Sequence, residues 1–223
     1  DIHGGAGDDE ITVRGEDGEN LDHVVVRADS GDDTIHAYGS YHYLNGGAGD
    51  DEIHIWSDEN SEEESHNDAV SGNKGNDTIY VHAGYGHVVN GGAGNDSIFV
   101  AADSSRVSGG AGNDTIHVMG DGTGHILRGG LGSDVYEVDA IFNDTFLTID
   151  QQDFTAGDLD VLNLLNYNQG DVLYTFQDDT LSISHVEGGT LSVTNWNDNP
   201  LNTIVFADGE TSYTDINERI GLA

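Results

Sequence analysis

The sequence contains no cysteine, one proline and only six lysine and arginine residues among its 223 residues. Without cysteine the chain can form neither a disulfide nor a thiolate zinc site. The 42 acidic residues leave a formal net charge of −36, which argues against recognition of nucleic acids or anionic membranes through basic patches. No run of about 18 apolar residues is present, so we expect no transmembrane segment.

Hydrophobic residues make up only 35% of the chain, and residue 1 is an aspartate rather than a methionine. The first residue leads us to expect a fragment of a larger protein. Low hydrophobicity combined with a high net charge is typical of disordered chains. The glycines and acidic residues, however, are not scattered but recur in register. This internal repeat is the feature from which fold and function can be predicted.

The segment GGAGDDEITV, which starts at Gly4, recurs six times with small changes. The later copies start at Ala28, Gly46, Gly72, Gly91, Gly109 and Gly129. Consecutive starts are 18 to 26 residues apart, and the extra residues always fall between copies. A period near 18 with glycine-rich turns and short β-branched runs indicates an all-β parallel solenoid with two strands per coil.

Three apolar positions recur in the copies and form the predicted core. The first column is Ile11, Ile35, Ile53, Ile79, Ile98, Ile116 and Tyr136. Two residues later, on the same strand face, stand Val13, Ala37, Ile55, Val81, Val100, Val118 and Val138. The third column precedes the glycine-rich turns and is Val26, Leu44, Val70, Val89, Val107 and Leu127. Because one coil buries little surface, at least three coils must stack.

Every turn contains an aspartate at the same position, and stacking would bring these carboxylates to about the strand spacing of ~4.8 Å. The seven are Asp9, Asp33, Asp51, Asp77, Asp96, Asp114 and Asp134. Each neighbouring pair costs about 1 kcal/mol in water and ~3–4 kcal/mol at an effective dielectric constant near 20. The sum is comparable to the roughly 5–15 kcal/mol by which domains are stable. A hard cation with adaptable oxygen coordination would cancel this charge, and calcium fits better than magnesium or zinc.

The repeated GGxGxD pattern resembles the RTX (repeats-in-toxin) family, whose members are exported by Gram-negative bacteria through type I secretion. The resemblance implies a right-handed parallel β-roll over residues 1–139, with about six calcium ions between consecutive turns on one edge. It also implies that the seven aspartates bind with side chains and that turn residues bind with backbone carbonyls. The turn residues at these positions are Gly4, Ala6, Gly7, Gly31, Gly46, Ala48, Gly49, Gly72, Lys74, Gly75, Gly91, Ala93, Gly94, Gly109, Ala111, Gly112, Gly130 and Gly132.

Two copies depart from the pattern. The second has Ala28 and Asp29 where glycines are expected, and the fourth has Asn73 and Lys74. We therefore expect weaker binding between Asp9 and Asp33, and between Asp51 and Asp77. The opposite edge has lost the motif altogether, so we expect calcium on one edge only. There His42, Asp68, His87 and His125 form either a column of stacked turn side chains or a site for a transition metal.

One residue per coil faces outward beside the core positions: Thr12, His36, His54, Tyr80, Phe99, His117 and Glu137. These rings either stack into a ladder or present a surface for sugars or a neighbouring domain. No GxSxG, HExxH or GxxxxGK motif is present. We therefore expect the chain not to be an enzyme.

Residues 140–223 lack the repeat and contain short β-type runs separated by Asn, Asp and Gly, which predicts antiparallel strands. A short helical turn is expected over 214–221. The region resembles the segment that follows the roll in haemolysin-type and adenylate-cyclase-type RTX toxins, through DVL at Asp171, TLSVTNW ending at Trp196 and IVFADG at Ile204. This resemblance implies a cap on the roll. The candidate cap core is Leu173, Leu191, Trp196 and Phe206, and an independent small β domain is the alternative.

The sequence thus predicts a secreted calcium-binding module that is disordered at low calcium and folds outside the cell. The expected partners are the remainder of a larger chain and the type I secretion machinery, and as a fragment we expect a monomer. Two alternatives stay open. One is an adhesin or carbohydrate-binding module that uses the outward aromatic face on a glycan or cell-surface ligand. The other is an auxiliary module of a secreted enzyme.

Overall fold

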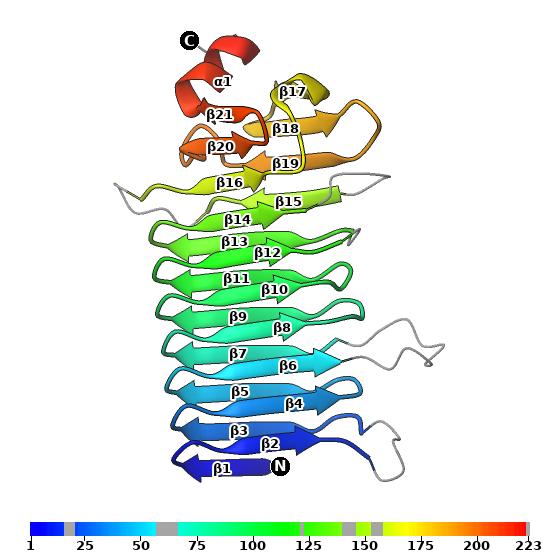
Figure 1. Ribbon diagram of the computed structural model, residues 1–223, viewed down its shortest axis with the longest axis vertical. Coiled ribbons are helices and arrows are strands. Elements are labelled where there is room, and N and C mark those ends of the chain that lie inside the picture. Colours follow the sequence, from blue (N-terminus) through cyan, green and yellow to red (C-terminus); the bar gives the residue numbers. More distant parts are fainter. Residues whose placement is uncertain (16–20, 57–66, 121–122, 140–145, 153–157, 222–223) are drawn as a thin grey trace.

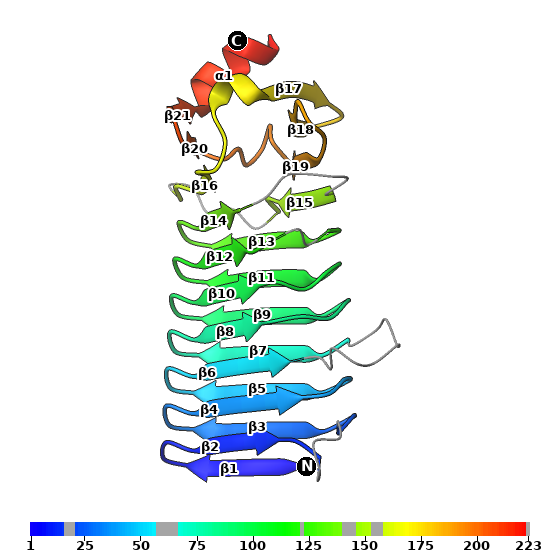
Figure 2. The same cartoon turned by 45° about the vertical axis from the view of Figure 1, so that its right-hand side comes forward.

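The computed structural model describes residues 1–15, 21–56, 67–120, 123–139, 146–152 and 158–221. The strands form a long ladder of coils, with the N-terminus at one end and a helix at the other (Figure 1). A view turned by 45° shows the same ladder, with the C-terminal strands and the helix closing it (Figure 2). The predicted all-β roll is therefore confirmed.

Two sheets face each other along this ladder. The parallel part of the first sheet contains β1 (Ile2–Ala6), β3 (Val25–Ser30), β5 (Tyr43–Ala48), β7 (Ala69–Lys74), β9 (Val88–Ala93), β11 (Arg106–Ala111), β13 (Ile126–Leu131) and β15 (Phe146–Asp150). The parallel part of the second contains β2 (Glu10–Val13), β4 (Thr34–Tyr38), β6 (Glu52–Trp56), β8 (Thr78–Val81), β10 (Ser97–Val100), β12 (Thr115–Val118), β14 (Val135–Val138) and β16 (Val161–Leu164). Each coil contributes one strand to each sheet.

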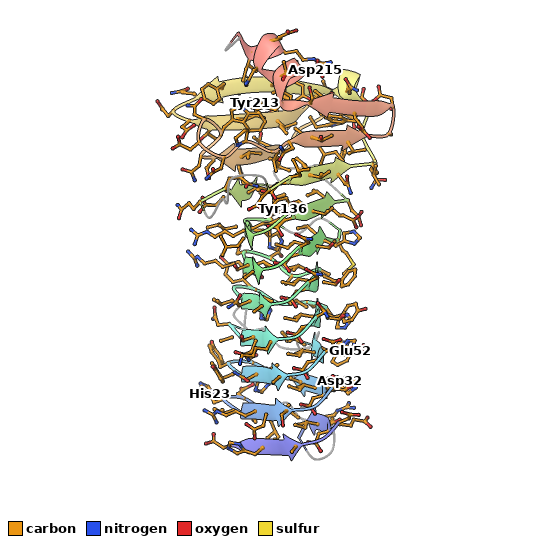
Figure 3. The ribbon with its side chains drawn as sticks, turned by 90° about the vertical axis from the view of Figure 1, so that its left-hand side faces the viewer. His23, Asp32, Glu52, Tyr136, Tyr213 and Asp215 are labelled. Carbon is orange, nitrogen blue, oxygen red and sulfur yellow. The ribbon has the colours of Figure 1, made fainter. Side chains whose placement is uncertain are left out.

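The core lies between the sheets because alternate side chains of every strand point inward. Parallel pairing places Ile98 beside Ile79 and Ile116, as the repeat predicts. Leu44 and Ile98 are fully buried. In the last copy Tyr136 occupies the isoleucine position, and its hydroxyl accepts a hydrogen bond of 2.7 Å from the backbone N–H of Gly129 (Figure 3). The three predicted columns are confirmed.

Parallel stacking continues beyond the last glycine-rich copy. β15 pairs with β13, and β16 pairs with β14, both in parallel. β19 (Thr190–Thr194) and β20 (Thr203–Phe206) extend the two sheets by one more parallel strand each. The expectation of antiparallel strands is wrong for β15 and β16 and for one side of β19 and β20, because alternating apolar residues maintain the parallel stacking after the glycine-rich turn is lost. The domain boundary at residue 139 stays a prediction, and both sheets run through it.

Antiparallel pairing is confined to the end of each sheet. β18 (Thr180–His185) lies between β19 and β17 (Val172–Gln177), and β21 (Gly209–Ser212) pairs with β20. A 3₁₀ turn, η2 (Gln169–Asp171), precedes β17. The helix α1 (Tyr213–Ile220) begins with a capping box between Ser212 and Asp215 and ends at Gly221 in the left-handed conformation. The predicted helical turn is therefore confirmed.

The core of the C-terminal strands contains three of the four predicted residues. Trp196 and Leu191 are fully buried and Phe206 is 2% exposed, whereas Leu173 is 63% exposed. The assignment of Leu173 is wrong because β17 pairs with β18 so that Tyr174, not Leu173, lies opposite the buried Ile183. Trp196 also donates a hydrogen bond of 3.1 Å from Nε1 to Oδ1 of Asn217 in α1.

Replacing Trp196 by alanine should lower the free energy of unfolding by about 3–5 kcal/mol, because it removes the largest buried side chain of this core. Leu173→Ala is the matched control and should cost less than about 0.5 kcal/mol, since Leu173 is exposed. Urea denaturation with calcium held constant measures both. Equal losses would contradict the packing described for β17.

Candidate metal-binding edge

The glycine-rich turns lie along one edge of the roll, on the left in Figure 1, where each first-sheet strand passes into a second-sheet strand. The second glycine of the motif has a positive φ, for example 121° at Gly47. Asp29 and Asn73 replace this glycine in the two departing copies and adopt φ values of 78° and 80°. Asp and Asn tolerate the left-handed region better than other side chains. The turn backbone therefore keeps a positive φ at this position where the sequence departs from the motif.

The seven turn aspartates form one hydrogen-bonded column, which we call the aspartate ladder: Asp9, Asp33, Asp51, Asp77, Asp96, Asp114 and Asp134. The backbone N–H of each aspartate donates to Oδ1 of the aspartate in the next coil. The N···O distance is 2.8 Å from Asp77 to Asp96 and 2.9 Å from Asp114 to Asp134. From Asp33 onward these residues are only 1–2% exposed. One carboxylate oxygen thus links each coil to the preceding one.

The other carboxylate oxygen has no hydrogen-bond partner. Oδ2 is buried and unpaired in all seven residues of the aspartate ladder. Buried polar atoms are rarely left unsatisfied, because each costs free energy that a partner would offset. Seven such oxygens in one row fit a cation as their shared partner better than seven isolated defects.

Backbone oxygens approach the same positions. A Cβ added to Gly91 would collide with Oδ2 of Asp96 and would lie 2.6 Å from the carbonyl oxygen of Gly109 in the next coil. At Gly4 the corresponding distances are 2.7 Å to Oδ2 of Asp9 and 2.7 Å to the carbonyl oxygen of Ala28. Carboxylate and carbonyl oxygens of consecutive coils therefore converge beside the first glycine of the turn. Such a set of hard oxygens suits calcium.

The other predicted carbonyl ligands also lie between coils. The carbonyls of Ala48, Lys74, Ala93 and Ala111 each accept a hydrogen bond from a glycine N–H of the preceding coil, at 2.8–3.0 Å. The third glycines of the turns, Gly7, Gly31, Gly49, Gly75, Gly94 and Gly112, turn their carbonyl oxygens toward the equivalent glycine of the next coil. The first group keeps one lone pair for a cation. The carbonyl oxygens of the second group lie so close to the next coil that a side chain in place of its third glycine would collide with them.

Burial raises the pKa values of the aspartate ladder. The pKa rises to about 6 at Asp51 and Asp114 and to about 7 at Asp77 and Asp134. Desolvation is the main cause and neighbouring carboxylates add to it, while the hydrogen bond from the preceding coil opposes it. The pKa values of Asp33 and Asp96 are also raised by burial. Without a cation, the folded roll therefore disfavours its own negative charge.

A second, exposed ladder runs beside the first and was not anticipated from the sequence. The side-chain oxygens of Asp8, Asp32, Asp50, Asn76, Asn95 and Asn113 each accept the backbone N–H of the equivalent residue in the next coil. Its N–H groups point to the preceding coil, opposite to those of the aspartate ladder. The signal was present, since every copy but the last has Asp or Asn before the motif aspartate.

The aspartate ladder also extends one residue beyond its predicted end. The N–H of Asp134 donates to Oδ1 of Asp160 at 2.9 Å, and the N–H of Asp160 donates to Oδ1 of Asn202 at 2.8 Å. Burial raises the pKa of Asp160, while hydrogen bonds, including one from the Gln151 side chain, oppose this. The sequence DVLNL from Asp160 has the alternation of DVYEV from Asp134 but lacks the full glycine motif.

A family model for the RTX calcium-binding nonapeptide repeat matches four stretches of the chain, residues 1–20, 27–54, 64–85 and 90–121. These stretches contain the turns whose geometry is described above. The repeat region of the chain belongs to the RTX repeat family. No curated protein matches it. Among the described residues of this RTX roll, no helix is long and apolar enough to cross a membrane.

The edge of the RTX roll opposite the aspartate ladder carries His42, Asp68, His87, Ser105 and His125, all 0–2% exposed. The N–H of His42 donates to Oδ1 of Asp68 at 2.7 Å, as in the aspartate ladder. His42 accepts the Val24 N–H at Nδ1 and pairs through Nε2 with the Tyr38 carbonyl, both at 3.3 Å. Both ring nitrogens are therefore in use.

His87 likewise lies with Nδ1 beside Asp68 and Nε2 3.1 Å from the Ala83 carbonyl. At this edge, the described residues include no group of three or more His, Asp or Glu side chains that could hold a metal ion. For His42 and His87 the geometry thus favours stacked turn side chains over ligands of a transition metal.

The outward rings of the second sheet stack on one another. Ring centroids are 4.6 Å apart between His54 and Tyr80 and 4.8 Å between Tyr80 and Phe99, with nearly parallel planes. Trp56 stacks in the same way on Tyr38 in one coil and on His82 in another. Because these faces cover each other, the ladder presents mainly ring edges to a ligand. Sugar binding on this face stays a prediction.

Acidification should favour the roll in the absence of calcium. The raised pKa values mean that between about pH 4 and 7 the folded chain binds more protons than the unfolded chain, so stability rises as pH falls. We expect the far-UV circular dichroism signal of β-structure in EDTA to increase from about pH 7.5 to about pH 6. His82 and His125, whose pKa values are lowered by burial, oppose the trend below about pH 7, but the aspartates with raised pKa values outnumber them.

The control is a variant with Asp77→Asn and Asp134→Asn, which removes the two ladder carboxyls whose pKa reaches about 7. Its calcium-free signal should depend less on pH. Loss of β-structure on acidification of the unmodified chain over the same range would contradict the assignment.

Proposed function

We propose that this RTX module is a calcium-responsive folding unit that is unfolded at low calcium and forms the roll when calcium fills its turns. The observation that carries the proposal is the row of seven buried, unpaired Oδ2 atoms. A carboxylate in this position costs free energy in the folded state but not in the unfolded chain, where water solvates it. The calcium-free roll is therefore at a disadvantage that a cation removes.

The residues that would hold calcium are the seven members of the aspartate ladder together with the carbonyls of their turns. The oxygen donors come from consecutive coils, so seven turns provide about six intervals. Calcium accepts six to eight oxygen ligands in adaptable geometry, whereas magnesium keeps its waters more firmly. Because each interval joins two coils, binding stabilises only the stacked state. Binding free energy then becomes folding free energy.

The same reasoning supports a role in export. A chain with a formal charge of −36 and no cysteine repels itself and forms no cross-links while calcium is scarce. An unfolded chain can pass through a type I secretion channel. Outside a Gram-negative cell, calcium is present at millimolar concentration, which is sufficient to fill extracellular sites of modest affinity. The C-terminal strands cover the end of both sheets and act as the cap. In this proposal the module is a non-catalytic, monomeric part of a larger secreted protein.

Far-UV circular dichroism during a calcium titration from EDTA to about 10 mM tests the proposal directly. We expect a cooperative transition from coil to β-structure with calcium, and little change with magnesium at the same concentrations. A chain that is already β-rich in EDTA at neutral pH would overturn the proposal. Calcium would then be a ligand of a preformed roll.

Asparagine substitutions test the position of the sites. Asp96→Asn keeps an oxygen that accepts the hydrogen bond from the Asp77 N–H. It removes the negative charge of Asp96 from two intervals, the one toward Asp77 and the one toward Asp114. Asp9→Asn affects only the interval toward Asp33 within this chain. We expect Asp96→Asn to raise the calcium midpoint by about 2- to 10-fold and Asp9→Asn by less, because ligand charge sets calcium affinity. Equal shifts would contradict binding between coils.

A further inference from the structure

Two adjoining hollows lie on the outer face of the first sheet, away from the aspartate ladder. One has a volume of about 340 Å³ and is lined by residues of β9, β11 and β13, including Val88, Asn90 and Ser108. The other has a volume of about 320 Å³ and reaches the turn edge at Asn67 and Tyr85. Both are lined by Arg106 and Ile126. Because they share these two side chains, the hollows adjoin one another, and we call the pair the Arg106 groove.

The Arg106 groove concentrates positive charge in a protein that has very little. Only six lysine and arginine residues oppose 42 acidic ones, and two of the six line this groove. Arg128 donates from Nε and Nη2 to Oδ2 of Asp150, at 2.9 and 2.6 Å. Arg106 is exposed, and the described part of the chain shows no ion pair for it. As far as the described residues go, its guanidinium is therefore open to a ligand.

The remaining lining combines apolar, aromatic and hydrogen-bonding groups. Val88 and Tyr85 are 51% and 49% exposed. No ring contact covers Tyr85 within the described residues, in contrast to the stacked rings of the second sheet. Asn67, Asn90 and Ser108 add amide and hydroxyl groups that can both donate and accept hydrogen bonds. Asp103 lies near the rim and is engaged by the N–H of Thr123.

We infer that the Arg106 groove binds a carboxylated sugar, such as a sialic or uronic acid residue of an oligosaccharide. The guanidinium fork of Arg106 matches a carboxylate in a bidentate manner. The ring of Tyr85 and the side chain of Val88 suit the apolar C–H face of a sugar, and the amides and hydroxyls suit its hydroxyl groups. A doubly charged phosphate or sulfate fits less well, because repulsion by the protein's net charge grows with the charge of the ligand.

The inference goes beyond calcium binding and requires only the folded roll. Isothermal titration calorimetry on the calcium-saturated chain would compare sialyllactose with lactose, and trigalacturonate with its neutral methyl ester. These two pairs distinguish sialic from uronic acids as the source of the carboxylate. We expect saturable binding of at least one acidic sugar and none of its neutral counterpart. Inorganic sulfate should not compete at equal concentration.

Arg106→Gln should weaken this binding by about 10- to 100-fold, as expected for loss of a charged hydrogen bond. Arg106→Lys should restore only part of it, since lysine lacks the fork. Tyr85→Ala should also weaken binding, whereas Arg27→Gln should not. Arg27 is the matched control because it lies on the same sheet but does not line the Arg106 groove. Its guanidinium lies 4.0 Å from the Asp1 carboxylate and over the ring of Tyr43.

Each variant's calcium midpoint should equal that of the unmodified chain, which shows that the roll is intact and separates this test from that of calcium-driven folding. The inference is wrong if no acidic sugar binds saturably, if the neutral partners bind as tightly, or if Arg106→Gln binds like the unmodified chain. Full competition by sulfate would identify a general anion site and would also overturn it.

Discussion

The buried aspartate ladder is the interaction on which the rest of this structure depends. From Asp33 onward, one oxygen of each carboxylate accepts a backbone N–H from the preceding coil and so fixes how the coils stack. The other oxygen is buried without a partner. A single side chain therefore both builds the edge and makes it electrostatically unfavourable. In the proposed module a hard cation between the turns would resolve this conflict without disturbing the hydrogen bond.

At the two edges of the roll, different side chains accept hydrogen bonds from the buried backbone N–H groups of the turns. At both edges a buried side chain accepts the N–H of a neighbouring coil, through Asp96 on one edge and His125 on the other. At the histidine edge three imidazoles and the single carboxylate of Asp68 do this, so little negative charge accumulates. The histidine edge therefore holds one buried carboxylate in its column, whereas the aspartate edge holds seven. This asymmetry supports the view that calcium acts on one side of the roll.

Much of this arrangement could be predicted from the sequence because the repeat fixes it by local rules. Strand periodicity identifies the core columns, and the glycine pattern identifies the turns. What could not be predicted depends on pairing between distant segments. Leu173 is a plausible core residue by composition, yet the pairing of β17 with β18 places it outside. Asp160 lacks the full glycine motif around it, so only the stacked structure reveals its place in the ladder.

The polarity of the aspartate ladder explains why the closing strands lie at the C-terminal end. Each buried N–H needs an acceptor in the following coil, so the last aspartate depends on what comes after it. Asp160 supplies that acceptor to Asp134, and the neutral amide of Asn202 supplies it to Asp160. The exposed ladder runs the other way, but water can satisfy its N–H groups. A coil added on the N-terminal side therefore finds its buried acceptor already in place, whereas one added on the C-terminal side does not. By this argument the roll is best assembled from the capped end, with calcium joining each new coil to the last.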